Sequence, residues 1–464
     1  MVRKNFMSLR GIVTGILFSC LFVFLPREAM GPFVIFVLGI FLGFVCMSLY
    51  GKEEGLSLMT LFLVAYALRA FLSTLFYFIS FLYQDSLHAG FLFLNDGYIS
   101  HVVACRMVHM MKLGLSPIQG SIWAYGQVTA PLPYEYWNFY VYSFAGTTPI
   151  AMYLVNSFIG ALTVFVLYDF IRTLFGRRAA HRAAVLCAFW PSLIFWSTHN
   201  LKDPLITFSL TLFVSSLSTI LKKPTLLRLA SLALSVFIFY QIQSLLLMVA
   251  VILAVFSIFV SLKIHHTFWM RTFWVSFFMG AVFAFAMGFI PLSLVTGMMT
   301  HFQNYFVRHF DLRKQSTIFE EGFQTINTLR GSRAQGGSAF LKDISISSPL
   351  SLLIFLPLLL CYVWLGPFPW QAFGFFKFFS ALEMLIFYFL MPAFFRGVRN
   401  AFHKERMAAM LTFSTIFTFM LLIALLDSNL GTAFRHRSNI MTLILGFVAV
   451  GWKEKKREAV SLGN

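Results

Sequence analysis

Hydrophobic runs of about twenty residues, enough to cross a hydrocarbon layer about 30 Å thick, recur from one end of the chain to the other. We place membrane spans at residues 11–26, 31–50, 56–82, 148–171, 183–197, 201–221, 272–296, 348–366, 371–393, 408–426 and 438–451. The apolar segment 225–262 is too long for one span and is interrupted at Gln241-Ile242-Gln243. We therefore interpret that segment as two short spans.

These runs predict helices and not a barrel. In lipid the backbone must satisfy its own hydrogen bonds, and the runs lack the alternation of transmembrane strands. The pattern therefore predicts an all-α polytopic membrane protein with about 12–13 transmembrane helices. We expect a single integral membrane domain over 1–464, with three N-terminal spans in 1–83, a first outer loop in 84–146, central spans in 147–296, a second long loop in 297–346 and C-terminal spans in 347–464. Both long loops are expected to carry interfacial helices.

Composition agrees with this class and excludes others. Hydrophobic residues make up 59% of the 464 residues and charged residues 11%, against about 25% charged in a soluble domain. The net charge of +18 is carried by short basic clusters between spans, which is the pattern of cytoplasmic loops and not of a nucleic-acid surface. We expect a multi-pass protein of the cell (inner) membrane, in contact with the lipid bilayer and with no nucleic-acid partner.

The basic clusters also expose an inconsistency in this assignment. Residues 396–406 and 453–457 are both rich in Lys and Arg and should both be cytoplasmic. Counting spans forward from the N-terminus places the first of them outside. One crossing is therefore misassigned between 224 and 367, either in 225–262 or through a re-entrant piece in 297–346.

The first outer loop contains the most prominent candidate for catalysis, Asp96, in the sequence Asn95-Asp96-Gly97-Tyr98. A helix is predicted at 98–112, with polar positions on one face (Tyr98, His101, Cys105, His109, Lys112) and apolar positions on the other (Ile99, Val103, Met107, Met110). Such a helix lies in the membrane interface and would hold Asp96 at headgroup height. The alternative is structural, because Asn-Asp-Gly is common in turns and Asp96 suits a helix N-cap.

Two further polar segments are predicted on the same outer side. The first contains His199, Lys202 and Asp203, although Asp203 before Pro204 is also a good helix start. The second, between the last two spans, contains Arg435 and Arg437. Their guanidinium groups suit a phosphate, and a general headgroup anchor is the alternative.

Charged residues elsewhere are weaker candidates. Arg69 and Glu383 lie within predicted spans, where an ionisable residue marks a functional position or, for Arg69, snorkels to the interface. Glu320-Glu321 has the form of a metal pair, but its spacing from Thr317 favours a capping box. No metal site is recognisable, so a divalent cofactor is left undetermined, and the five cysteines imply no disulfide framework.

Taken in order, several of these pieces resemble bacterial membrane glycosyltransferases of the GT-C superfamily, close to the protein O-mannosyltransferase-like group (family 39). The pieces are Asp96 with Tyr98 and Ala104; Tyr142, Gly146 and Asn156; the 170–176 segment; Pro191-Ser192; the turn from Trp196-Ser197 to Lys202-Asp203; Gly336-Gly337-Ser338; Pro367-Phe368-Pro369-Trp370; and Gly431 with Arg435 and Arg437. Together they cover about 96–450.

The resemblance implies a transferase of the cell envelope that acts in glycan biosynthesis. A polyprenyl-phosphate sugar would be the donor, and a hydroxyl of a glycan, lipid or protein the acceptor. Asp96 would act as general base, Arg435 and Arg437 would bind the leaving phosphate, and Lys202 would assist. Tyr98, His101, His199 and Asp203 complete the expected substrate-binding set. In one departure, many relatives carry two adjacent acids where Asn95 precedes Asp96 here, so either Asp203 supplies the second carboxylate or the activity is altered or lost.

Two other functions remain open at this stage. A transporter or flippase of a lipid-linked saccharide would use Arg69 and Glu383 along its pathway, although no paired interrupted spans or internal repeat accompany them. A glycan polymerase or ligase would differ from the transferase only in its acceptor and in the number of sugars moved.

Overall fold

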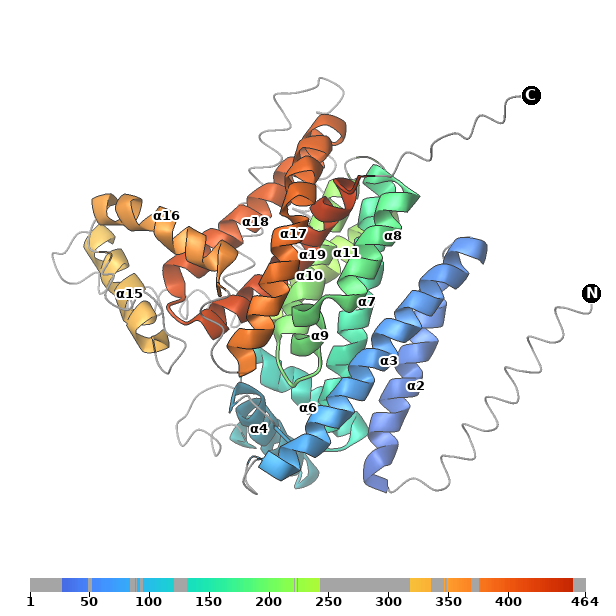
Figure 1. Ribbon diagram of the computed structural model, residues 1–464. Helices are drawn as coiled ribbons and strands as arrows, with labels where there is room; N and C mark the ends of the chain where they lie inside the picture. Colours follow the sequence, from blue (N-terminus) through green and yellow to red (C-terminus); the bar gives the residue numbers. More distant parts are fainter. Residues whose placement is uncertain are drawn as a thin grey trace, which may run out of the picture. The chain divides into compact units, whose positions relative to one another are not determined.

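The computed structural model describes residues 27–48, 52–83, 88, 90–91, 95–120, 132–220, 222, 224–242, 318–334, 346, 349–368 and 375–453. These residues form helices and no β-strand (Figure 1). The longer helices are α2 (Arg27–Met47), α3 (Lys52–Tyr83), α4 (Asn95–Lys112), α6 (Pro133–Ala145), α7 (Pro149–Phe175), α8 (Arg177–Phe189), α9 (Pro191–Ser197), α10 (Asp203–Ile220), α11 (Leu226–Ile242), α15 (Ile318–Arg333), α16 (Pro349–Leu365), α17 (Phe375–Lys404), α18 (Arg406–Leu426) and α19 (Leu430–Val450).

The protein is an all-α polytopic membrane protein, as its hydropathy predicted. Among the described residues, five helices are long and apolar enough to cross a membrane: α3, α7, α10, α17 and α18. The spans expected at 11–26 and 272–296, and residues 243–262 of the long apolar segment, lie outside the described part. So do Gly336-Gly337-Ser338 and most of the second long loop.

Two predicted spans are wrong in detail. The span expected at 183–197 consists of two short helices, α8 and α9, separated at Trp190, which adopts extended backbone angles before Pro191. The residue before a proline is driven away from helical angles, which explains the break. The span expected at 438–451 begins earlier, at Leu430, where Asn429 caps α19 by accepting from the backbone N–H groups of Gly431 and Thr432. Arg435 and Arg437 are therefore helical residues and not loop residues.

The chain divides into two compact units. Met1–Leu162 with Ser197–Pro204 form the first, and Thr163–Trp196 with Leu205–Asn464 form the second. In the first unit, Phe36 of α2 packs against Tyr66 of α3 with ring centroids 5.1 Å apart. Gly31 lies so close to α6 that an added Cβ would sit 1.7 Å from the carbonyl oxygen of Ala145, so only glycine fits there.

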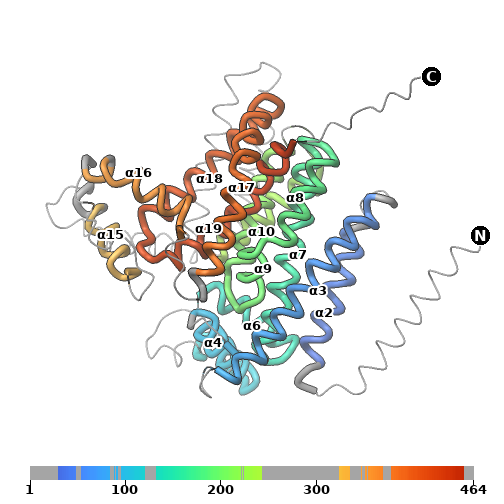
Figure 2. The backbone as a smooth tube through the Cα atoms, viewed as in Figure 1, coloured from blue at the N-terminus to red at the C-terminus, as the bar shows by residue number. Residues whose placement is uncertain are grey.

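The second unit is built around α19. Helices α17 and α19 run side by side (Figures 1 and 2), and an added Cβ on Gly397 would lie 1.7 Å from the Phe447 carbonyl oxygen. Buried hydroxyl and amide groups join α10 to α19: Thr207 donates to Asn439 over 3.1 Å, and the Thr211 and Thr442 hydroxyls lie 2.7 Å apart. Small and hydroxyl-bearing residues are the usual means by which membrane helices associate.

The basic clusters of the second unit lie at one end of its helices. Lys222, after α10, pairs with Glu405, before α18. Arg396 of α17 donates to the Gly451 carbonyl oxygen over 3.1 Å, just beyond α19. Cluster 396–406 and the residues preceding 453–457 are therefore on the same side, as the positive-inside bias requires. The count of crossings was therefore wrong for the cluster at 396–406. Residues 243–317, which include parts of both segments where the misassigned crossing was expected, are outside the described part.

Candidate functional site

In the first unit, the side-chain amide of Asn156 on α7 bonds to the polar turn at residues 197–204. Its Nδ2 donates to the carbonyl oxygens of His199 (2.7 Å) and Leu201 (2.9 Å), and it lies 3.1 Å from the Tyr134 hydroxyl. Tyr134 in turn donates to Oδ1 of Asn200 over 2.9 Å. Because Asn156 and Asn200 are buried, these bonds replace water for a segment that has no regular backbone pairing of its own.

Arg69 of α3 supports the start of this turn. Its side chain is fully buried, with Nε donating to the Ser197 hydroxyl over 3.1 Å and Nη1 to the Ala65 carbonyl oxygen over 3.0 Å. The Ser73 hydroxyl adds contacts with Ser157 (2.9 Å) and with the Thr198 carbonyl oxygen (3.3 Å). The arginine therefore faces protein, and the snorkelling alternative is wrong. Its bond to the Ser197 hydroxyl gives it a role in positioning the turn.

The predicted residues of this turn differ in exposure. His199 is buried and stacks on Phe76 with ring centroids 5.4 Å apart, while its Nδ1 lies 3.1 Å from the Thr198 hydroxyl. Asp203 is 2% exposed and is the first residue of α10, followed by Pro204. Lys202 is partly exposed. Helix α10 begins at Asp203 itself, so Pro204 is its second residue and Asp203 does not precede the helix as the predicted N-cap would. Lys202 is the residue of this turn nearest to solvent.

Helix α4 brings Asp96 to this turn. The Asn200 Nδ2 donates to the Gly97 carbonyl oxygen over 3.2 Å, and an added Cβ on Gly97 would lie 2.8 Å from the Asn200 carbonyl oxygen. Asp96 lies in the first helical turn and its side chain is exposed. Because α4 begins at Asn95, Asp96 is inside the helix and does not precede it as an N-cap. An acidic residue in this position also stabilises the helix dipole.

The other two predicted residues of α4 face protein. Tyr98 packs against His88 and Phe91, with ring centroids 4.7 and 5.7 Å away. His101 Nδ1 lies 2.8 Å from the Tyr142 hydroxyl of α6, and the Cys105 sulfur lies 3.5 Å from Nε2. The predicted polar face of α4 is thus partly wrong, since His101 and Cys105 pack on α6 while Ile99 is exposed.

Burial controls the protonation of this cluster. It lowers the pKa of His101 to about 4 and raises that of Cys105 to about 12, and the pKa of Tyr142 is also raised, first by burial. At neutral pH the imidazole is therefore neutral and the thiol protonated. The thiol is not activated as a nucleophile, because a reactive cysteine needs a lowered pKa.

In the second unit, Arg437 of α19 is 3% exposed. Its Nη1 donates to the carbonyl oxygens of Val363 (2.9 Å) and Gly366 (2.7 Å). Nε and Nη2 make no hydrogen bond within the described part of the chain. A buried guanidinium with two such donors is costly unless another group receives them.

Glu383 of α17 provides the opposite charge. It is 1% exposed, and Ser192 holds it twice, through the backbone N–H to Oε2 (2.6 Å) and through the hydroxyl to Oε1 (3.0 Å). Glu383 and Arg437 interact electrostatically without being in contact as an ion pair. Arg435, also in the N-terminal part of α19, is partly exposed. Its guanidinium carbon lies 5.9 Å from the centroid of the Trp196 ring.

A second charged group in this unit, centred on Asp427, was not predicted from the sequence. This buried carboxylate follows α18 and binds Arg333 Nη1 at 2.5 Å and His436 Nδ1 at 2.6 Å. The Arg330 guanidinium donates to the Ala424 carbonyl oxygen over 3.1 Å, and the backbone carbonyl oxygen of Arg330 accepts from the Ser428 hydroxyl. These bonds attach α15 to the α18–α19 corner. The predicted span at 408–426 ends just before Asp427, so the sequence did place this residue at the end of a helix. Nothing in the sequence, however, indicated that Asp427 pairs with Arg333, 94 residues away.

No group of three or more His, Cys, Asp or Glu side chains in the described residues is arranged to hold a metal ion. Thr317 and the Glu320-Glu321 side chains lie outside the described part, so the capping box stays a prediction; α15 is described from Ile318. No model of a known protein family matches the chain, and no curated protein matches its sequence.

Proposed function

We propose that this protein is a membrane glycosyltransferase of the GT-C type, which takes a sugar from a polyprenyl-phosphate carrier and gives it to an acceptor hydroxyl at the outer face of the membrane. The observation that carries the proposal is the position of Asp96. It is an exposed carboxylate in the first turn of α4, and the next residue is fixed by Asn200 of the 197–204 turn. A base needs this combination of access and a rigid support.

In the proposed reaction, the acceptor O–H gives its proton to the Asp96 carboxylate as the oxygen forms a bond to the anomeric carbon of the sugar. The bond from that carbon to the phosphate oxygen breaks, and polyprenyl phosphate leaves with the electron pair. Lys202, partly exposed in the same unit, is our candidate for the cation that stabilises the departing phosphate. Such electrostatic support contributes more to rate than the base does.

Within the second unit, Arg437 is a separate candidate for binding a phosphate. Its Nε and Nη2 have no partner in the described residues, and a phosphate supplies the acceptor oxygens that such donors match. Arg435 is the accompanying surface cation. The carboxylate of Glu383 limits the net charge around Arg437, which explains how the arginine is tolerated when no anion is bound.

The test is release of polyprenyl phosphate from a mixed pool of polyprenyl-phosphate sugars by purified protein in detergent, with a pool of acceptors present. Wild type should release it, and Asp96→Asn should reduce the rate by a factor of about 100 to 10,000. Asp169→Asn is the matched control, since it removes a partly exposed carboxylate of α7 near the basic end, and it should leave the rate unchanged. Equal release by wild type and Asp96→Asn would remove Asp96 as the base.

The transporter or flippase alternative makes a different prediction for the same preparations. Its candidate residues, Arg69 and Glu383, are buried and hydrogen-bonded within the described protein, which favours positioning roles. If neither variant nor wild type releases polyprenyl phosphate, while the lipid-linked saccharide still binds and Arg435→Ala abolishes that binding, the enzyme proposal fails and the carrier class takes its place.

A further inference from the structure

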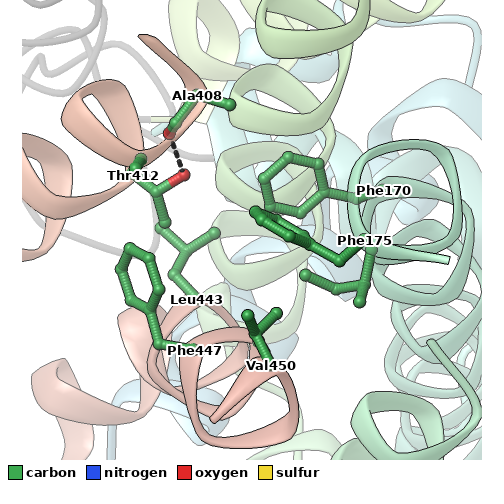
Figure 3. Close-up of a pocket in the computed structure, with 10 residues that line it drawn as sticks. Phe170, Phe175, Ala408, Thr412, Leu443, Phe447 and Val450 are labelled. Atoms are coloured by element: carbon green, nitrogen blue, oxygen red, sulfur yellow. Dashed lines mark hydrogen bonds between the residues drawn. The ribbon is translucent and has the colours of Figure 1, made fainter. Parts of the chain in front are cut away.

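The two ends of helix α18 have contrasting surroundings. At its basic end, apolar side chains of α7 and α19, among them Phe175 and Phe447, meet Ala408 and Thr412 (Figure 3). The Thr412 hydroxyl donates to the Ala408 carbonyl oxygen over 2.7 Å, so this polar group is already satisfied. The other end of α18 leads into charged side chains that are not all satisfied.

These charged side chains form the Asp427 corner, which comprises Arg330, Arg333, Asp427, Ser428 and His436. It joins α15 to the connection between α18 and α19. Helix α18 is 21 residues long and is one of the helices able to cross a membrane. At about 1.5 Å per residue its ends are about 30 Å apart, so the corner lies a membrane's thickness away from the basic end.

His436 turns one ring nitrogen towards the protein and leaves the other available. Nδ1 lies 2.6 Å from Oδ2 of Asp427, whose side chain is fully buried, whereas 36% of the His436 side chain is exposed. An ionised carboxylate only accepts hydrogen bonds, so the hydrogen of this contact belongs to Nδ1. Within the described part of the chain the imidazole is bonded to Asp427. Nε2, on the opposite edge of the ring, is therefore available to a ligand.

Arg330 contributes a buried donor to the same corner. It is 4% exposed, and its Nη1 donates to the Ala424 carbonyl oxygen over 3.1 Å. Its Nη2 is buried and has no hydrogen-bond partner among the described residues, which is costly unless an acceptor reaches it. Arg330 lies one helical turn before Arg333 on α15 and interacts electrostatically with Asp427. Its charge therefore belongs to the corner.

The corner carries an excess of positive charge. Arg330 and Arg333 are opposed by one carboxylate, that of Asp427, which binds Arg333 at 2.5 Å. Helices α18 and α19 contain no acidic residue. The acidic pair 320–321 is in the first turn of α15, about 15 Å along the helix from Arg330. A bound anion would balance the remaining charge and supply the acceptor that Arg330 Nη2 needs.

We infer that the Asp427 corner binds a phosphate monoester, with Arg330 Nη2 donating to its oxygens, His436 Nε2 in contact with it and Asp427 orienting the imidazole. Phosphate oxygens match the donors of guanidinium groups. A phosphate monoester has a second pKa of about 6, so part of its population near neutral pH also keeps a hydrogen. That O–H donates to the lone pair of a neutral Nε2, which a sulfate or carboxylate ion cannot do.

This site is separate from the one suggested for Arg437. Consecutive residues of a helix project about 100° apart. Arg437 accordingly donates to the carbonyl oxygens of Val363 and Gly366, whereas His436 contacts Asp427. The inference does not depend on the proposed sugar transfer, because phosphate binding is measured without a sugar donor.

Isothermal titration calorimetry of the full-length protein in a non-ionic detergent at pH 7 tests it, with inorganic phosphate and sulfate as probes. Wild type should bind phosphate about tenfold or more tightly than sulfate, the factor that one hydrogen bond supplies. His436→Asn keeps an amide N–H for Asp427 and removes Nε2, so it should bind phosphate as weakly as sulfate. Arg330→Lys keeps the charge and loses Nη2, and should weaken both anions about tenfold.

Ser428→Ala is the matched control. It removes the hydroxyl that donates to the Arg330 carbonyl oxygen and leaves the proposed ligand contacts in place, so it should bind phosphate as wild type does. Three results would overturn the inference: no phosphate binding by wild type, equal binding of phosphate and sulfate, or equal weakening by Ser428→Ala and His436→Asn. The corner would then serve only to attach α15.

Polyprenyl phosphate, as a third probe, distinguishes the two sources of a phosphate monoester. If wild type binds it more tightly than inorganic phosphate, and His436→Asn weakens it, the ligand is carried by a lipid. If inorganic phosphate alone responds to His436→Asn, the ligand is soluble. Both results agree with a phosphate site at this corner. Binding of both probes that neither His436→Asn nor Arg330→Lys changes would contradict it.

Discussion

The two compact units each bury an arginine, and they treat it differently. Arg69 in the first unit is bonded to the Ser197 hydroxyl and the Ala65 carbonyl oxygen and holds a turn in place. Arg437 in the second unit uses one nitrogen on two carbonyl oxygens, and two nitrogens have no hydrogen-bond partner in the described chain. The comparison separates a cation that fixes the backbone from one whose remaining donors suit a ligand.

The largest change in the free energy of unfolding is expected from removing the buried arginine of the second unit, Arg437. Arg437→Met leaves the Glu383 carboxylate buried without its opposing charge, and the free energy of unfolding should fall by about 3–5 kcal/mol. Adding Glu383→Gln to Arg437→Met should restore most of it. Reversible unfolding in mixed micelles measures both. Binding of the donor can be measured as retention of a polyprenyl-phosphate sugar. The double variant should bind this donor about tenfold or more weakly than wild type does, because the phosphate contact is still missing.

A double variant that recovers donor binding together with stability would remove the distinction between the two arginines. Both would then be structural. Glu383→Gln alone is the control for the substitution at α17, and it should bind donor at least as tightly as wild type, since it removes a negative charge facing Arg437.

Removing Arg69, the buried arginine of the first unit, should lower stability and leave donor binding unchanged. Arg69→Met removes charge-assisted hydrogen bonds to Ser197 and Ala65, each contributing about 1.5–3 kcal/mol, and should lower the free energy of unfolding by about 3 kcal/mol. The affinity for donor should be unchanged in the fraction that remains folded. Ser197→Ala removes one of the same partners and should reproduce part of the loss. A selective loss of donor binding in Arg69→Met, at full stability, would place Arg69 in a ligand pathway.

The hydropathy of the chain predicted much of the fold, because a helix that contacts lipid must consist mainly of apolar residues and such runs are visible in the sequence. The spans expected at 56–82, 148–171 and 408–426 match α3, α7 and α18 to within a few residues. Hydropathy missed the first two turns of α19, because it detects contact with lipid and not contact with other parts of the protein. Gly431, Arg435 and Arg437 read as a polar loop, yet Arg437 is buried among protein groups that hydropathy does not register.

The candidate site was predictable only in part. Sidedness placed Asp96 and the 199–203 turn together, and the Asn200 to Gly97 bond does so in the structure. The amide that organises the turn, Asn156, entered only through the resemblance, because its partners are 43 and 45 residues away. Hydrogen bonds of that kind follow from packing and leave no local pattern.

A pH dependence distinguishes the first unit further, because His101 is a half-buried titratable group of that unit. Its pKa is lowered to about 4 from about 6.5 in the unfolded chain, so protons bind preferentially to the unfolded state. The stability it supports is present above about pH 6.5 and is lost as the pH falls towards 4, by at most about 3 kcal/mol. Unfolding of wild type and His101→Gln across pH 4–7 measures this. Parallel curves for the two proteins would show that His101 is not the group responsible.

The smallest effect is expected where a charge pair of the second unit is exposed. Lys222 and Glu405 pair at the basic end with side-chain exposures of 42% and 18%, and such pairs contribute about 0.2–1 kcal/mol. Lys222→Gln should therefore change the free energy of unfolding by less than about 1 kcal/mol, and 0.5 M salt should weaken the wild-type pair through screening. Lys404→Gln, which removes an exposed cation of α17 with no such pair assigned, is the control. If Lys222→Gln lowered the free energy of unfolding as much as Arg437→Met does, the stability of this unit would depend on removal of a charge as such and not on whether that charge is buried.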